Sequence, residues 1–172
     1  MHLPLIARLA AVLASEEKVI FDWSVMDERI AQCGCGRLKV RVRGEPLGVL
    51  RCHCDFCQKQ TGSAFRLSSF FLEDQVLEIT GQPNVYNGLE IDGVGPGGSV
   101  DNGVAYHFCG TCGSTVYWIW KTGRLTGIYG ITVGSFVDPD FPPPTMEVWT
   151  ELRHRWVALI PGAVTHEHLP DP

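Results

Sequence analysis

The stretch HFCGTCGS, residues 107–114, carries two cysteines separated by two residues, with a glycine directly after the second. This CxxC spacing lets two thiolates meet one metal ion, because the turn between them is tight and glycine can adopt the left-handed conformation that such turns need. Two thiolates supply half of a tetrahedral zinc site. The stretch therefore predicts that a second pair of ligands comes from elsewhere in the chain.

That second pair lies in CGCG, residues 33–36. Two cysteines at this spacing on an extended segment point to the same side of the backbone. Joined to Cys109 and Cys112, Cys33 and Cys35 complete a closed four-sulfur zinc site. Metal binding there contributes folding free energy, because it ties the first predicted strand to a distant hairpin. The predicted role of this site is structural.

The other three cysteines lie in CHCDFC, residues 52–57. Because the chain has seven cysteines, Cys52, Cys54 and Cys57 have no eighth cysteine to complete their set. A zinc ion with three protein ligands keeps one coordination position for water or substrate, which is typical of a catalytic site. The sequence therefore predicts two zinc ions per chain, one structural and one catalytic.

Alternatives to this assignment stay open. Disulfides and buried free thiols are disfavoured, because the count is odd and Cys-x-Cys bridges are strained. A fourth protein ligand at the second site would make both zinc ions structural. His53 is adjacent, but between two ligands on an extended stretch it should face the other way. His107 is expected to be a strand residue near the four-cysteine site, and a distant His or Asp remains open.

Short alternating or aromatic runs, separated by turn residues, follow Cys33 and predict a mainly β fold of one domain. A length of 172 residues with 45% apolar content suits one domain with an ordinary core. The predicted strands lie in residues 38–44, 47–52, 64–72, 75–80, 104–108, 114–120, 125–133 and 146–150.

The chain divides into three parts by pattern. Residues 1–30 are predicted to be an N-terminal extension with a short helix over residues 4–18; alternatively, the native protein starts at Met26. Residues 31–162 form the predicted zinc-binding domain, and residues 163–172 a polar C-terminal tail. Within the domain, the glycine-rich residues 87–103 are predicted to be a mobile surface loop.

Charge and hydropathy narrow the function classes. The formal net charge is −5, and the 14 Lys and Arg residues are scattered, so nucleic acid is not an expected partner. The longest apolar stretch, LPLIARLAAVLA, is short and interrupted by Arg8, which argues against a membrane span and against a secretory signal. We expect a cytoplasmic protein that binds no membrane.

Several motifs together resemble the family of glutathione-dependent formaldehyde-activating enzymes and centromere protein V. They are CGCG with GEPL, RCHCDFCQKQTGSAF, HFCGTCGSTVYW, and GSFVDP with PPPTMEVWTELRHRWV, and they extend from about Cys33 to Trp156. The resemblance implies a β-tent fold of twisted antiparallel sheets pinned by zinc. It implies these ligand sets: Cys33, Cys35, Cys109 and Cys112 on one zinc ion, and Cys52, Cys54 and Cys57 on the other.

The resemblance also implies carbon–sulfur lyase chemistry that joins glutathione to formaldehyde. A zinc ion held by three thiolates is a weak Lewis acid but an electron-rich site, which suits delivery of a bound thiolate to an aldehyde carbon. We therefore expect a zinc-dependent lyase whose partners are a small thiol, such as glutathione, and an aldehyde. The alternative is a non-enzymatic zinc-binding module with both zinc ions structural.

His53 and Lys59 are the candidate catalytic and substrate-binding residues. His53 stands where the resemblance implies a glycine, and its pKa normally lies near neutrality, which suits a proton shuttle. Lys59 is placed to attract a carboxylate of glutathione, with Arg51 and Arg66 as further candidates; for each cation the alternative is a solvated surface charge. The aromatic residues Phe108, Tyr117, Trp118 and Trp120 alternate on strands that are expected to flank the four-cysteine site, and they are expected to pack in the core and not to form a ligand cage.

Overall fold

The computed structural model describes residues 28–87, 103–123 and 125–169, and it is mainly β, as predicted. Its strands are β1 (Glu28–Gln32), β2 (Lys39–Arg43), β3 (Gly48–Cys52), β4 (Arg66–Leu72), β5 (Val76–Thr80), β6 (Pro83–Asn87), β7 (Val104–Cys109), β8 (Thr115–Trp120), β9 (Ile128–Thr132), β10 (Met146–Val148) and β11 (Val164–Thr165). Its helices are α2 (Asp55–Thr61) and the 3-10 turns η2 (Glu73–Gln75), η5 (Val133–Ser135) and η6 (Thr150–Leu152).

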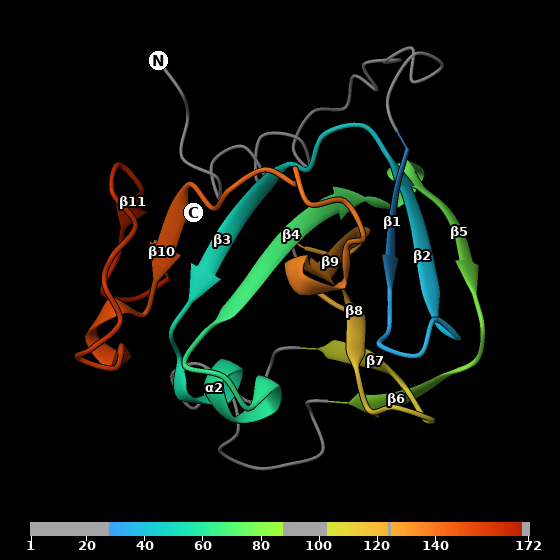
Figure 1. Cartoon of the computed structure of the whole chain (residues 1–172), viewed down its shortest axis with the longest axis horizontal. Coiled ribbons are helices and arrows are strands. Elements are labelled where there is room, and N and C mark those ends of the chain that lie inside the picture. Colours follow the sequence, from blue (N-terminus) through green and yellow to red (C-terminus); the bar gives the residue numbers. More distant parts are fainter. Residues whose placement is uncertain (1–27, 88–102, 124, 170–172) are drawn as a thin grey trace.

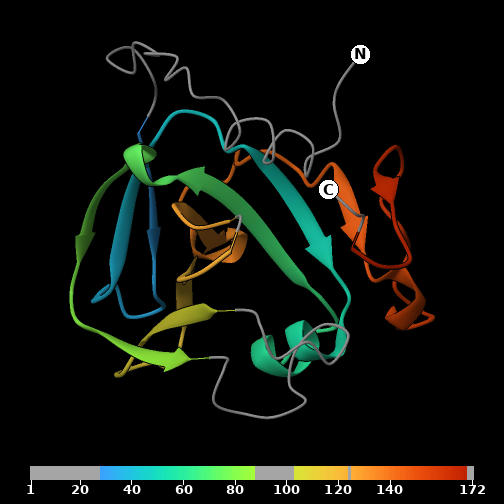
Figure 2. The ribbon, with the colours of Figure 1, turned by 180° about the vertical axis from the view of Figure 1, so that it is seen from behind.

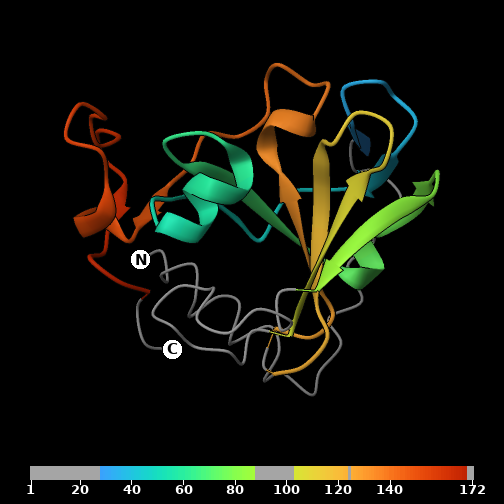
Figure 3. The same cartoon turned by 90° about the horizontal axis from the view of Figure 1, so that it is seen from below.

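The strands form two sheets. One has the order β1-β2-β5, and the other has the order β11-β10-β3-β4-β9-β8-β7-β6. Figure 1 shows β3 and β4 crossing the molecule between the small sheet and the pair β10 and β11. Seen from below, β9, β8, β7 and β6 fan out, which is the twist expected of such a sheet (Figure 3). Most pairs are antiparallel, but β10 runs parallel to both β3 and β11.

Strand β8 separates two hydrophobic cores. Successive residues of a strand point to opposite faces, so Tyr117 packs in a core with Cys33 and Cys109, whereas Trp118 packs in a core with the three cysteines of residues 52–57. Trp120 packs against the same core as Trp118. The predicted core packing is confirmed for Tyr117 and Trp118, which are buried, and Trp120 packs partly buried against the core of Trp118. Of these three residues, only Tyr117 shares a core with Cys33 and Cys109.

Every predicted strand segment contains an observed strand, and the structure adds elements that the pattern did not indicate. Strand β1 takes residues 28–30, which the sequence assigned to the N-terminal extension, into the small sheet. Strand β6 and helix α2 were not predicted, and β11 draws part of the expected tail onto β10. The predicted helix over residues 4–18 and residues 88–102 of the predicted loop lie outside the described residues.

Helix α2 joins the end of β3 to the start of β4 (Figure 2). It begins because Cys54, as N-cap, accepts a hydrogen bond from the backbone N–H of Cys57, and it ends at Gly62, whose φ of 65° is left-handed. Within the described part of the chain, no helix is long and apolar enough to cross a membrane.

Candidate metal centres

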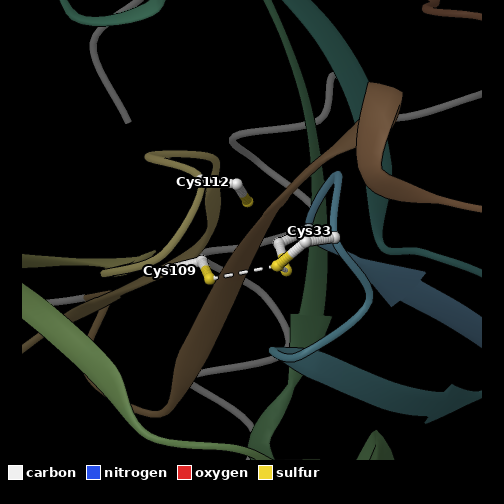
Figure 4. A group of neighbouring side chains, drawn as sticks. Cys33, Cys109 and Cys112 are labelled. Carbon is white, nitrogen blue, oxygen red and sulfur yellow. Dashed lines mark hydrogen bonds between the residues drawn. The ribbon is translucent and has the colours of Figure 1, made fainter.

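The four-cysteine group joins two turns that lie far apart in the sequence. The four Sγ atoms lie within 4.8 Å of one another, and Cys35 Sγ is 3.6 Å from Cys33 Sγ and 3.7 Å from Cys109 Sγ. Figure 4 shows Cys33 facing Cys109 and Cys112 across the space between the turns. Cys33 and Cys109 are buried, whereas Cys35 and Cys112 are exposed. The group therefore lies at the edge of the core that contains Tyr117.

Glycine conformation shapes both turns. Gly113 has a φ of 74° and donates its N–H to the carbonyl of Cys109 at 2.8 Å. Gly36 has a φ of 71° and donates in the same way to Cys33 at 2.9 Å. Left-handed φ favours glycine at both positions, which confirms the reading of the CxxC turn. The N–H of Gly34 also donates to the Ser114 hydroxyl at 3.2 Å, so the two turns are linked directly.

The second group, Cys52, Cys54 and Cys57, is called here the three-cysteine site. Its members lie at the end of β3, at the N-cap of α2 and in the first turn of that helix. Their Sγ atoms lie within 4.8 Å of one another. Their exposed fractions are 8%, 0% and 7%, so the site is buried in the core that contains Trp118.

The electrostatics of the three-cysteine site favour a negative charge on Cys54. The hydrogen bond from Cys52, helped by that from Cys57, lowers the pKa of Cys54 to about 3. The hydrogen bond with Cys54 raises the pKa of Cys52. For Cys57, the hydrogen bond with Cys52 lowers the pKa, but the bond with Cys54 and burial outweigh it, and the pKa rises to about 12. Two thiols, those of Cys52 and Cys57, thus converge on the anionic sulfur of Cys54.

Both groups fit a zinc ion by donor chemistry. Thiolates are ligands that zinc prefers, and all seven cysteines are free thiols. In residues 28–87, 103–123 and 125–169, no fourth His, Cys, Asp or Glu joins the three-cysteine site, and His53 is not part of it. The donor sets of four and three match the partition predicted from the sequence.

His53 is fully buried and hydrogen-bonded to Glu147. Its Nε2 lies 2.8 Å from Glu147 Oε2, and that oxygen also accepts from Arg51 Nε at 2.6 Å. Burial lowers the pKa of His53, and the Arg51 charge lowers it further, against the effect of Glu147. Burial alone would raise the pKa of Glu147, but hydrogen bonds from His53, the Ile160 amide and Arg51 hold it below its usual value. A neutral His53 therefore donates its Nε2–H to a charged carboxylate.

This network fixes the backbone between Cys52 and Cys54. The His53 N–H donates to the Val148 carbonyl at 3.1 Å, and the His53 carbonyl accepts from Gln58 Nε2 at 2.6 Å. The structure thus places His53 away from the sulfur atoms, facing β10, as the alternation of an extended stretch predicts. A catalytic role for His53 stays a prediction. Sequence reasoning did not single out Glu147, although an acidic residue inside the apolar run MEVW was a signal of a buried charge.

The three candidate cations have different surroundings. Lys59 is exposed and pairs with Asp55, one helical turn earlier, at 3.1 Å; its substrate-binding role stays a prediction. Arg51 and Arg66 are buried, with exposed fractions of 7% and 4%, so the surface alternative is wrong for both.

His107 lies on β7, as expected, and stacks on Tyr117 with ring centroids 4.2 Å apart.

Arg66 lies among aromatic rings in the core of the three-cysteine site. Its guanidinium carbon is 5.0 Å from the Trp118 ring centroid, 5.2 Å from that of Tyr106 and 5.8 Å from that of Phe56. The Trp118 indole packs across Gly130 on β9, where an added Cβ would lie 2.0 Å from Cε2 of the indole. The missing side chain of Gly130 therefore lets Trp118 take this position.

Of the comparisons with known proteins, the one with models of protein families agrees with the sequence motifs. One solved structure that resembles the chain is a protein of Rhodobacter sphaeroides, with 19% identity and a TM-score of 0.45, covering 80% of this chain and 98% of that one. No curated protein matches the chain. Among models of protein families, the one described as glutathione-dependent formaldehyde-activating enzyme matches residues 28–152. This range is more than half of the chain and includes every cysteine, so the chain belongs to that family.

Proposed function

We propose that the protein is a zinc-dependent carbon–sulfur lyase that acts on adducts of a thiol and an aldehyde, glutathione and formaldehyde or a related pair. One observation carries the proposal: three buried sulfur atoms converge without a fourth described ligand, while the other four cysteines form a complete set. Membership of the family supports the thiol and aldehyde as reactants.

In this proposal the three cysteines hold the metal and are not nucleophiles. A zinc ion held by Cys52, Cys54 and Cys57 would supply one kind of chemistry: it would lower the pKa of a substrate thiol, so that the thiolate is available to attack the aldehyde. Cys52, Cys54 and Cys57 are at most 8% exposed, so the substrate sulfur is largely shielded from water and stays nucleophilic. The network of His53, Glu147 and Arg51 keeps Cys52 and Cys54 in place.

The reaction balances without an oxidant or reductant. The substrate sulfur attacks the aldehyde carbon, a carbon–sulfur bond forms, and the carbon–oxygen π bond breaks. The proton that the thiol loses ends on the new hydroxyl oxygen, so that thiol and aldehyde give an S-hydroxyalkyl adduct. The lyase direction is the reverse, in which the carbon–sulfur bond breaks and both reactants are released.

Cobalt substitution tests the proposal. Co²⁺ loaded into both centres reports on each set of ligands through its absorption spectrum. Addition of glutathione should change the spectrum of the wild-type protein, and Cys54→Ser, which removes one ligand of the three-cysteine site, should abolish this change while the chain stays folded. If the spectrum of the wild-type protein does not respond to any thiol, or if Cys54→Ser leaves thiol-dependent adduct formation intact, the proposal is wrong.

A second function is favoured by the deep burial of the three-cysteine site. A buried set of thiolates also suits a non-enzymatic module in which both metal ions only stabilise the fold. The same titration separates the two functions, because a structural ion with a complete ligand set does not respond to added thiol.

A further inference from the structure

Arg66 is a buried cation without a carboxylate partner among the described residues. It is 4% exposed, and none of the ion pairs formed by the described residues includes it. Arg51, which is buried to a similar degree, pairs with Glu147. An isolated buried charge is costly, and buried cations normally pair with an anion. The structure therefore raises the question of which anion Arg66 offsets.

The immediate partners of Arg66 are neutral. One guanidinium nitrogen donates to the Gln60 side-chain oxygen. Three aromatic rings surround the group, those of Phe56, Tyr106 and Trp118. Burial raises the pKa of Tyr106 to about 12, so its hydroxyl stays protonated at neutral pH. Ring faces attract a cation, but they carry no net charge.

The sulfur atoms of the three-cysteine site lie on the side of the sheet to which Arg66 projects. Arg66 on β4 is the direct cross-strand partner of Cys52 on β3, and residues directly opposite each other on paired strands project to the same face. Arg66 and the three cysteines belong to the same part of the core, because Tyr106 and Trp118, which lie against the guanidinium, pack in one cluster with those cysteines.

We propose that Arg66 makes the metal ion of the three-cysteine site selective for an anionic fourth ligand over a neutral one. Three thiolates and one divalent cation give a net charge of −1, and an anionic ligand takes it to −2. A fixed positive charge in a buried site favours each step that makes the site more negative. A neutral ligand leaves the charge unchanged and gains nothing from Arg66.

For thiols this inference rests on the proposed function, and it names the ligand as a deprotonated sulfur. Arg66 then acts on the metal-bound sulfur, and it acts on thiols with or without a carboxylate. It is a specificity-determining residue, since it favours the thiolate over water or an imidazole in the same position. The inference also applies to small anions that are not substrates, and so it can be tested independently of the lyase reaction.

The test measures ligand binding to the cobalt-loaded protein by absorption. The probes are azide as a small anion, imidazole as a neutral ligand and 2-mercaptoethanol as a thiol without a carboxylate. Arg66→Met should weaken the binding of azide and of 2-mercaptoethanol by roughly tenfold or more and leave the binding of imidazole unchanged. Arg66→Lys, which keeps the charge, should bind azide nearly as the wild-type protein does. Arg41→Met removes an exposed arginine of the small sheet and should change nothing.

Gln60→Glu gives a second test that keeps the arginine. The new carboxylate would replace the amide oxygen that Arg66 contacts, neutralise the charge, and weaken azide binding as Arg66→Met does. Equal affinities for azide in the wild-type protein, Arg66→Met and Gln60→Glu would overturn the inference. A loss of affinity for imidazole in Arg66→Met as large as the loss for azide would also overturn it. So would a loss of affinity for glutathione without a loss for 2-mercaptoethanol, because that result would assign Arg66 to a substrate carboxylate. If azide binding depends on Arg66 but no thiol binds to the wild-type protein, the inference stands and the proposed function fails.

Discussion

The two cysteine groups differ in almost every respect other than their ligand chemistry. The four-cysteine site draws its ligands from two turns, with contacting cysteines 74 residues apart, and half of them are exposed. The three-cysteine site draws its ligands from CHCDFC, residues 52–57, and all three are buried. When the ligands of a metal ion come from distant segments, the ion links those segments and contributes to the stability of the fold. When all the ligands lie in one short segment, the ion links no distant parts of the chain. The first site should therefore govern stability and the second should govern ligand binding.

The largest expected effect is the loss of the four-cysteine site. Cys109→Ser should lower the free energy of unfolding by about 5 kcal/mol or more, because the metal would no longer join the turn after β1 to the β7–β8 turn. Urea unfolding of the zinc-loaded protein measures this change. Cys54→Ser is the matched control and should cost much less. Equal losses for both variants would contradict the difference between the sites.

The next effect concerns the network that supports the three-cysteine site. Glu147→Ala should lower the free energy of unfolding by about 3–5 kcal/mol, because it leaves Arg51 buried without its anion and His53 without its acceptor. Zinc content should also fall toward one ion per chain. Glu78→Ala, which removes an exposed carboxylate paired with Arg41, is the control. A Glu147→Ala protein with wild-type stability would show that the network does not hold this region.

A smaller effect is expected at Gly130. Gly130→Ala places a methyl group into the Trp118 indole and should cost about 1–3 kcal/mol. The near-ultraviolet circular dichroism should change as well, because Trp118 would have to move. Gly134→Ala, where an added Cβ meets nothing within 4 Å, is the control. An unchanged spectrum and stability for Gly130→Ala would contradict the position of Trp118 against Arg66.

The smallest effect is expected at Lys59. Lys59→Met should change the free energy of unfolding by less than about 0.5 kcal/mol, because the pair with Asp55 is exposed. Zinc content should be unchanged. A selective fall in the affinity for glutathione, with none for 2-mercaptoethanol, would support the predicted contact with a substrate carboxylate. A large loss of stability would show that Lys59 has a structural role that its exposed pair does not explain.

Local features of the sequence predicted the partition of the cysteines and most of the strands. The odd number of cysteines and the spacing of Cys33, Cys35, Cys109 and Cys112 were sufficient to divide the cysteines into two ligand sets, because metal geometry restricts which thiols can share an ion. The alternation of apolar and polar residues in short runs was sufficient to predict β2, β3 and β4, because strand periodicity is a local property of the sequence. Helix α2 was missed because its seven residues, Asp55–Thr61, are too few to show helical periodicity.

The environment of the three-cysteine site could not be predicted in the same way. Whether Arg66 is solvated or buried depends on Tyr106 and Trp118, which come from distant strands. The partner of His53 is Glu147, 94 residues later, and the two meet only because β10 pairs in parallel with β3. Short sequence patterns carry no information on such pairings, so the partners of the buried charged residues are the least predictable part of the site.

The most direct test of the difference between the two sites is X-ray absorption at the zinc edge of the fully loaded protein, before and after addition of 2-mercaptoethanol. We expect about 3.5 sulfur ligands per zinc ion before the thiol is added, the mean of a four-cysteine and a three-cysteine set. The thiol should raise this value to about 4, because its sulfur completes the second set. A sulfur count that does not rise would mean that the three-cysteine site has no position for a substrate thiol.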